Sequence, residues 1–91
     1  MAYCTIVEFE WDETFDRDGF ASLMAGEENP PPGRLSRIAG IDSSGARMIE
    51  VWRSSDDARS FAEKSAPALA RVALPAPSRV VGFEVTQYVV S

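Results

Sequence analysis

The chain has 91 residues, of which 45% are hydrophobic, and its formal net charge at pH 7 is −5. This size describes one small globular domain over residues 1–91, whose limited core makes oligomerisation a reasonable way to complete it. An acidic chain with one lysine and scattered arginines is not expected to bind nucleic acid, because neutralising phosphates requires clustered cations.

Cysteine and histidine usage narrows the chemistry further. Cys4 is the only cysteine and histidine is absent from the sequence. An intramolecular disulfide and a cysteine zinc site are therefore excluded, and the usual metal ligand and general base is missing. The sequence contains no apolar run near the roughly 18 residues of a membrane span, and residues 1–4 do not resemble a signal peptide. We expect a cytoplasmic protein with no membrane contact, metal or organic cofactor.

The first third of the chain predicts a strand, a helix and a stiff connector. Residues 3–11 alternate with period two and are rich in aromatic and β-branched side chains, which is typical of a strand. Asp12 is a candidate N-cap for a helix that ends near Gly26. The run Asn29-Pro30-Pro31-Pro32-Gly33 is neither helix nor inner strand, because proline removes a backbone donor and fixes φ.

The remaining elements are a hairpin, a second helical region and a last strand. Residues 35–42 and 47–53 are two strands joined by a turn. Ser54 or Ser55 caps the following helix, and Pro67 is expected to divide it into helices at roughly 55–65 and 67–73. A β-branched strand over 80–90 completes a βαββαβ order. This order predicts a ferredoxin-like α+β fold, with a four-stranded antiparallel sheet in the order 4-1-3-2 and both helical regions on one face.

The hairpin determines which side chains share a face of the sheet. Closing it around Ser44-Gly45 pairs Arg37 with Trp52, Ala39 with Glu50, and Ile41 with Met48. The alternate face, where Ile38 meets Val51 and Gly40 meets Ile49, is aliphatic and is expected to lie under the helices with Val7, Phe9, Val81, Phe83 and Val85. The opposite face then carries Cys4, Ile6, Glu8, Arg37, Ile41, Met48, Glu50, Trp52, Glu84, Thr86 and Tyr88. A slip of one residue reverses the assignment of a strand.

The second of these faces predicts self-association. Its apolar members, among them Trp52, Met48 and Tyr88, form a larger patch than soluble monomers usually expose. A second copy packed sheet against sheet covers the patch and produces an isologous homodimer.

A family resemblance rests on the segment Val51-Trp52-Arg53-Ser54, which is followed by an acidic capped helix containing Phe61. With the strand order and chain length, this segment resembles the dimeric α/β-barrel superfamily, and within it the antibiotic-biosynthesis-monooxygenase-like group. The resemblance implies a dimeric barrel and a function among cofactor-free oxygenases, polyketide cyclases, haem-degrading enzymes or proteins without known activity. Two departures matter: Met48 stands where oxygenases of the group carry asparagine, and the histidine of haem-handling members is absent.

Several residues are candidates for a site, and each has a structural alternative. Trp52, with Met48, Tyr88 and Glu84, is a candidate for substrate binding, or Trp52 lies in the core or dimer interface. Arg37 either stabilises a carboxylate or enolate or neutralises Glu50. The candidate acid–base residues are Glu50 and Glu8. Together with Glu84 they place like charges on three neighbouring strands, which raises a carboxylate pKa unless arginines pair with them.

The family resemblance, taken with these candidate residues, implies a homodimeric, cofactor-independent enzyme of bacterial secondary metabolism. Its reaction is cyclisation, isomerisation or oxygenation of an aromatic or polyketide-like substrate, with Trp52 shaping the pocket, Arg37 stabilising negative charge and Glu50 or Glu8 moving a proton. The alternative is a homodimer that binds a hydrophobic metabolite, or a structural protein, without catalysis.

Overall fold

The computed structural model describes residues 1–11, 17–27, 29–71 and 76–90. Its elements are β1 (Tyr3–Glu10), α1 (Arg17–Ala25), β2 (Arg34–Ile41), β3 (Gly45–Trp52), α2 (Ser55–Arg71) and β4 (Arg79–Glu84). The strands form one sheet in the order β2-β3-β1-β4, and neighbouring strands are antiparallel. This architecture confirms the ferredoxin-like α+β fold. The predicted Asp12 cap lies outside the described residues.

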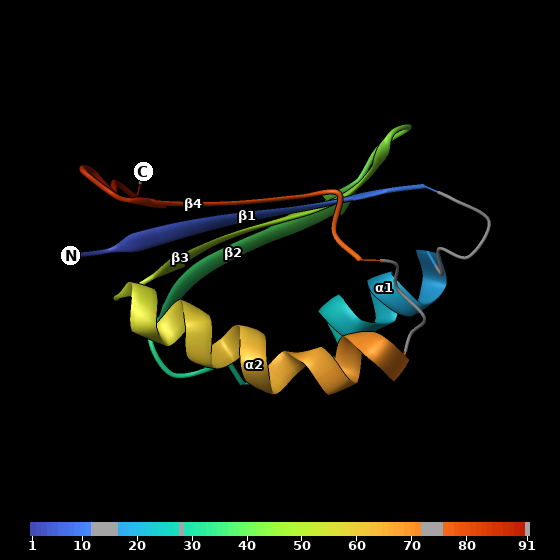
Figure 1. The fold of residues 1–91 in the computed structure, drawn as a ribbon, viewed down its shortest axis with the longest axis horizontal. Helices are drawn as coiled ribbons and strands as arrows, with labels where there is room; N and C mark the ends of the chain where they lie inside the picture. The colour runs from blue at the N-terminus through green and yellow to red at the C-terminus, as the bar shows by residue number, and fades with distance from the viewer. Residues whose placement is uncertain (12–16, 28, 72–75, 91) are drawn as a thin grey trace.

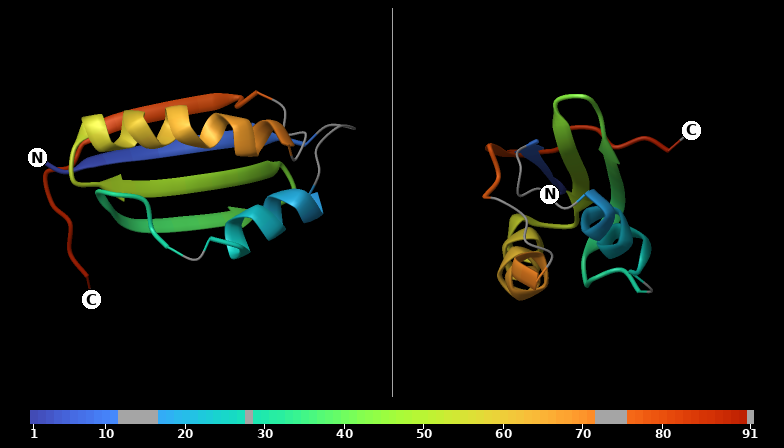
Figure 2. Two further views of the ribbon diagram at one scale, coloured as in Figure 1. Left: turned by 90° about the horizontal axis from the view of Figure 1, so that it is seen from below. Right: turned by 90° about the vertical axis from the view of Figure 1, so that its right-hand side faces the viewer.

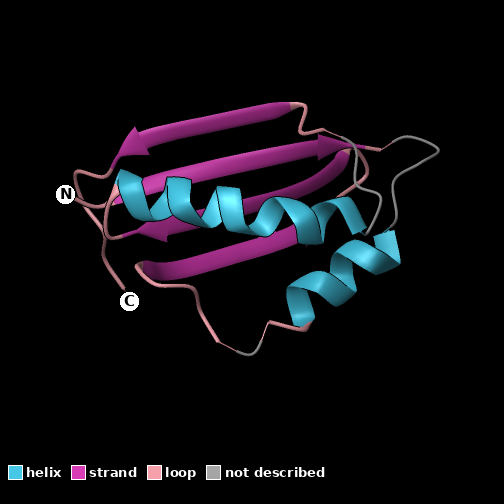
Figure 3. Ribbon diagram, turned by 60° about the horizontal axis from the view of Figure 1, so that its bottom comes forward, coloured by secondary structure: helices cyan, strands magenta, loops and turns pink. Residues whose placement is uncertain are grey.

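The molecule has two layers, a sheet and a pair of helices on one of its faces (Figure 1). The long helix α2 packs against β1 and β3, and α1 lies toward the β2 side of the sheet (Figure 2). Between the layers, the buried core residues are Phe9, Phe20, Ala46 and Met48, with Val7, Trp11 and Met24 packed against them. Both described helices lie in front of the same face of the sheet (Figure 3), so neither covers the opposite face, which is called the open face below.

The start of α2 is held by a capping interaction and by a close contact with the start of β2. The Asp57 amide donates to Ser54 Oγ at 3.2 Å, and the Ser54 hydroxyl donates to the Asp57 carboxylate at 3.1 Å. Gly33 has a φ of 85°, and a Cβ there would lie 2.3 Å from Asp57 Oδ2. Glycine is therefore required, because it alone combines this φ with so close an approach. The contact places Arg34 beside the first turn of α2.

Two predicted element boundaries are wrong. Pro67 lies inside α2, which continues from Ser55 to Arg71 instead of dividing into two helices. Proline removes one backbone hydrogen bond of the helix, and the packing of α2 along the sheet outweighs that local cost. The last strand ends at Glu84 and not at Val90. The Val85 amide donates to the carbonyl of Ala2, just before β1 begins, so the chain beyond has run past its partner strand.

The predicted hairpin register is also wrong, by two residues. Arg37 pairs with Glu50, Ala39 with Met48, and Ile41 with Ala46. The turn lies earlier than predicted because the Asp42 carboxylate organises it. Its Oδ1 accepts from the amides of Ser44 at 2.7 Å and Gly45 at 3.0 Å, while the Asp42 amide donates to the Gly45 carbonyl at 2.8 Å.

The face assignment is correct for β1 but reversed for the other three strands. Val7 and Phe9 lie under the helices as predicted, and Cys4 and Ile6 point to the open face. Residues paired across neighbouring strands point to the same face. Val7 pairs with Met48, so β3 directs Met48, Glu50 and Trp52 toward the helices and directs Ile49 and Val51 to the open face. By the same register, Arg37 and Ile41 lie on the helix side, whereas Ile38, Val81 and Phe83 lie on the open face. These strands have apolar residues on both faces, so alternation alone could not orient them.

Candidate functional site

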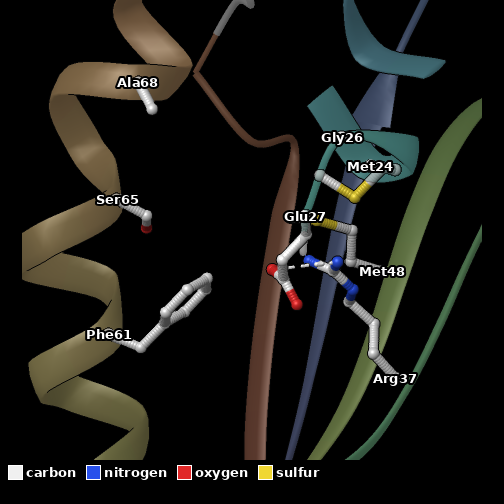
Figure 4. Close-up of a pocket in the computed structure, with 8 residues that line it drawn as sticks. All are labelled: Met24, Gly26, Glu27, Arg37, Met48, Phe61, Ser65 and Ala68. Atoms are coloured by element: carbon white, nitrogen blue, oxygen red, sulfur yellow. Dashed lines mark ion pairs between the residues drawn. The ribbon is translucent and has the colours of Figure 1, made fainter. Parts of the chain in front are cut away.

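A pocket of about 240 Å³ opens between the sheet and the two helices (Figure 4). The lining residues are Met24, Gly26, Glu27, Arg37, Met48, Phe61, Ser65 and Ala68. A second cavity, also of about 240 Å³, shares Met48, Phe61 and Ser65 with the first and reaches Glu50 and Trp52. Each cavity is slightly below the usual size of a small-molecule site, and the shared wall joins them into one candidate region.

The apolar wall of this region is built by Trp52 and Phe61. Trp52, at the end of β3, is 1% exposed, and its Nε1 donates to Thr5 Oγ1 at 3.2 Å. Its ring centroid lies 5.2 Å from that of Phe61, which α2 presents toward the sheet. The hydrogen bond and the tilted ring contact hold both aromatic side chains in fixed orientations. The wall is therefore a rigid surface suited to a flat apolar ligand.

Four charged side chains, Glu27, Arg34, Arg37 and Glu50, lie beside the aromatic wall and are called the charge cluster below. Both terminal nitrogens of Arg34 contact the carboxylate of Glu27. The Nη1 atom of Arg34 also lies 3.3 Å from Glu50 Oε2. Arg37 Nη2 lies 3.0 Å from Glu27 Oε2. The cluster thus joins the connector after α1 to β2 and β3.

A bulge in β2 brings the two arginines to the same face. Arg34 pairs with Trp52 and Ser36 with Val51, so the pairing skips Leu35. In a regular strand, residues three apart point to opposite faces, but one extra residue reverses the alternation. Arg34 and Arg37 both reach Glu27 for this reason. The irregularity therefore creates a double guanidinium site.

Burial and the two arginines act in opposite directions on the pKa of Glu50. This side chain is buried, with 4% exposure. Burial raises the pKa of Glu50, and the neighbouring guanidinium groups of Arg34 and Arg37 oppose that rise only in part. Burial and the charge of Arg37 in turn lower the pKa of Arg34. A carboxyl group at a cavity wall with a raised pKa can accept or deliver a proton without histidine.

Four of the residues predicted for the site come together here. Glu50, Arg37, Trp52 and Met48 line one or both cavities. They do so under the helices, and not on the uncovered face where the reversed assignment placed them.

The other three predicted site residues lie elsewhere. Glu8 is on the open face, with its Oε1 3.7 Å from Arg47 Nε. Glu84 is exposed at the end of β4, opposite Tyr3, and Tyr88 lies beyond the strand with 44% exposure. The predicted carboxylate cluster of Glu8, Glu50 and Glu84 does not form, because Glu8 and Glu50 point to opposite faces of the sheet. The functional roles of Glu8, Glu84 and Tyr88 stay predictions.

Sequence reasoning missed Arg34 and Glu27. Arg34 falls just before the strand predicted over residues 35–42, and Glu27 lies where neither helical nor strand periodicity applies. The close spacing of Arg34 and Arg37 was an available signal, but a regular strand would have separated them. Within the described residues, no group of three acidic or thiol side chains is arranged to hold a metal ion. Of the helices described, none has the length and apolar composition needed to span a membrane.

Comparison with solved structures identifies the class of fold. A proposed antibiotic biosynthesis monooxygenase from Chloroflexus aurantiacus superposes with a TM-score of 0.73 over 100% of both chains, at 18% identity. MupZ from Pseudomonas fluorescens gives 0.72 at 14% identity, covering 89% of this chain and 66% of its own. A monooxygenase from the gene ActVA-Orf6 of Streptomyces coelicolor, in complex with nanaomycin D, gives 0.69 at 16% identity, covering 99% and 92%.

The chain therefore has the ferredoxin-like fold of antibiotic-biosynthesis-monooxygenase-like proteins, as the sequence resemblance predicted. No sequence-family model matches the chain, and the search of curated proteins found no match.

Proposed function

We propose that this protein is a small-molecule enzyme of bacterial secondary metabolism that works in the cytoplasm without a metal or an organic cofactor. The observation that carries the proposal is the buried Glu50 carboxyl, with its raised pKa, at the wall of an aromatic cavity. A general base whose pKa is moved toward neutrality is suited to removing a proton at physiological pH. Glu50 is the residue we assign to that step.

The proposed chemistry begins with the loss of an acidic C–H proton from a ring carbon beside a carbonyl group. Glu50 takes the proton, and the enolate charge that forms is stabilised by Arg37, whose guanidinium borders the neighbouring cavity. Trp52 and Phe61 hold the flat ring system in place. The enolate then closes a ring, is reprotonated elsewhere, or reacts with dioxygen. In oxygenation the substrate supplies the electrons, one oxygen atom enters the product, and the other leaves as water.

An aromatic, polyketide-like substrate agrees with the lining of the cavities. Aromatic and aliphatic side chains dominate the wall, and the charged lining residues belong to the charge cluster. The Streptomyces coelicolor structure of the same fold contains nanaomycin D. That ligand supports the proposed substrate class for this chain.

The proposal is tested by turnover of anthrone in air-saturated buffer containing a chelator. Oxygenation consumes one dioxygen for each anthrone converted to anthraquinone and water, and both are measurable. We expect Glu50→Gln to lower the rate by about 100-fold or more, the usual contribution of a general base. Glu63→Gln, at an exposed position of α2, is the matched control and should retain the wild-type rate. Equal rates for Glu50→Gln and wild type would eliminate Glu50 as the base.

A non-catalytic role in binding a hydrophobic metabolite is the alternative. It is favoured by one contact, since Glu50 already has Arg34 as an ion-pair partner at 3.3 Å. Holding Arg34 in place can be the whole role of a carboxylate that is paired in this way. Tight binding of aromatic ligands without consumption of any of them would support this alternative.

The proposal includes a homodimer formed by the open face of the sheet. In register, Ile38, Ile49, Ile6 and Val81 form a continuous apolar row across all four strands. The next row adds Val51, Cys4 and Phe83, and Ile38 and Phe83 are 69% and 46% exposed. An apolar patch across a whole sheet face is typical of an interface, and a second copy offers the same surface. This proposed dimer interface contains different residues from the predicted one, because Trp52 and Met48 lie under the helices.

A further inference from the structure

We infer that Arg34 and Arg37 form a binding site for the carboxylate of an aromatic acid, and that Glu27 occupies this site in the ligand-free protein. The inference narrows the substrate class of the pocket and so rests on the proposed function. It follows from the geometry, exposure and net charge of the charge cluster.

The first argument is geometric. Both Glu27 oxygens face terminal nitrogens of Arg34, and Oε2 also lies 3.0 Å from Arg37 Nη2. A planar carboxylate held by one guanidinium through two bonds and by a second through one is a common arrangement for recognising a carboxylate ligand. Here a side chain of the protein fills that arrangement, and its carboxylate points into the pocket (Figure 4).

The second argument concerns which members of the cluster are fixed. Arg34, Arg37 and Glu50 lie on neighbouring strands, and their positions follow from the sheet register. Their side chains are 8%, 12% and 5% exposed. Glu27 is 22% exposed and lies between α1 and β2, outside any strand or helix. Glu27 is therefore the member that can leave the cluster without disturbing the sheet.

The third argument is the charge that Glu27 leaves behind. With Glu27 in place, two arginines face two glutamates and the cluster is neutral. Without it, two guanidinium groups share the single carboxylate of Glu50, and a buried cation lacks a partner, which is costly. A group that replaces Glu27 must therefore be anionic. A neutral ligand has no corresponding advantage.

The surroundings of the two arginines specify the rest of the ligand. Arg34 Cζ lies 6.0 Å from the centroid of the Phe61 ring, and Met24 and Met48 complete an apolar lining. A ring attached to a carboxylate bound here extends along Phe61, where an aromatic surface is favourable. An aromatic carboxylic acid satisfies both the charged and the apolar parts of the pocket.

Glu27 then acts as an internal competitor. Because it is covalently attached, it competes at an effective concentration of roughly millimolar order. Removing its carboxylate should tighten the binding of aromatic acids and leave neutral analogues of the same shape unaffected.

The test is isothermal titration calorimetry with 2-naphthoate and its neutral analogue 2-naphthamide. We expect Glu27→Ala to bind 2-naphthoate at least about 10-fold more tightly than wild type, and 2-naphthamide within about 3-fold of wild type. The matched control is Glu63→Ala, which changes the net charge equally from an exposed position on α2 and should bind both ligands like wild type. Arg37→Gln in the Glu27→Ala background should weaken 2-naphthoate binding by about 10-fold or more.

The outcomes separate this inference from the proposed function. The carboxylate site is overturned if Glu27→Ala binds 2-naphthoate no more tightly than wild type does, or if its affinity for 2-naphthamide rises by the same factor. Either result leaves the ligand pocket of the proposed function intact. Unchanged acid binding in the Arg37→Gln double variant overturns it too. Binding of neither ligand by any variant overturns the site and the ligand pocket together. Circular dichroism verifies folding, and Glu27→Gln, which carries the same expectation, replaces Glu27→Ala if that variant unfolds.

Discussion

At the scale of single residues, Glu50 connects the fold to its chemistry. Its neighbours on β3, Ile49 and Val51, point to the open face, while Glu50 is buried among Arg34, Arg37 and the aromatic wall. A buried carboxyl group is costly unless it is paired or protonated. Pairing with Arg34 offsets part of that cost, and burial raises the pKa of the Glu50 carboxyl despite the pairing. The properties that suit Glu50 to moving protons therefore also make stability depend on pH.

The sign of this dependence follows from the direction of the pKa shift. Glu50 has a higher pKa in the folded protein than the ordinary value of 4.5, so the folded state binds the proton more tightly than the unfolded state. Its protonation contributes stability that is fully present below about pH 4.5 and is lost as pH rises through the folded-state pKa. The free energy of unfolding of wild type should therefore fall relative to Glu50→Gln over this window.

The measurement is chemical denaturation of wild type and Glu50→Gln at intervals from pH 4 to pH 8. Glu63→Gln, exposed on α2, serves as the control and should follow the wild-type profile. A difference between wild type and Glu50→Gln that stays constant with pH would contradict the raised pKa.

At the scale of elements, two local irregularities shape the site. The bulge between Arg34 and Ser36 places both arginines on the helix side of β2. Pro67 lies in the last two turns of α2, just after Ser65, which lines both cavities. Each irregularity breaks a rule of regular secondary structure, and such departures are frequent near functional sites. The bulge is necessary for the charge cluster, whereas Pro67 weakens the helix that covers it.

Replacing Pro67 should show how much this proline lowers the stability of the protein. Pro67→Ala restores a backbone donor in the interior of α2 and removes the clash of the ring with the preceding turn. We expect the free energy of unfolding to increase by about 1–3 kcal/mol, which is somewhat less than the full helix penalty of proline because tertiary packing already accommodates it. Denaturant unfolding measures the change.

Pro32→Ala, in the exposed connector before β2, is the control. There the loss of proline should lower stability by about 0.5–1 kcal/mol, because the unfolded chain gains freedom. Equal effects of the two substitutions would show that Pro67 does not strain the helix.

At the scale of the whole molecule, the two faces of the sheet have different roles. The helix side holds the cavities and the charge cluster, and the open side carries the apolar row of Ile38, Ile49, Ile6 and Val81. Beyond this row, Glu8 is flanked by Arg47 and Arg79 on the neighbouring strands. The charged row bounds the apolar surface on one side, as at many interfaces with an apolar centre and a polar rim.

The dimer is tested by two substitutions on the same strand. Ile38 and Ile41 both lie on β2 and are 69% and 55% exposed, but they point to opposite faces. Ile38→Asp places a charge in the proposed interface and should shift the protein from dimer to monomer in sedimentation velocity, weakening association by about 100-fold or more. Ile41→Asp should leave the dimer intact. A wild-type protein that sediments as a monomer, or a dimer that tolerates Ile38→Asp, would contradict the proposed dimer interface.

Much of the architecture was determined by the sequence itself. The alternation of residues 3–10 specified β1 and its orientation, since Val7 and Phe9 lie on its helix side and Cys4 and Ile6 on the other. A serine cap at Ser54 or Ser55 was enough to predict where α2 begins, and Ser54 is the residue that accepts from the Asp57 amide. These features are local, because the spacing of side chains along one element and the chemistry of its ends are sufficient to predict them.

What the tertiary structure alone decided was the orientation of β2, β3 and β4 and the membership of the site. On β3, Met48 and Trp52 alternate with Ile49 and Val51, so either face satisfies the pattern of buried apolar residues. The Asp42 turn set a register two residues from the predicted one, and the β2 bulge brought Arg34 beside Arg37. Glu27 joined them from a connector without periodicity. Such contacts depend on the relative placement of separate elements, which alternation within one strand does not encode.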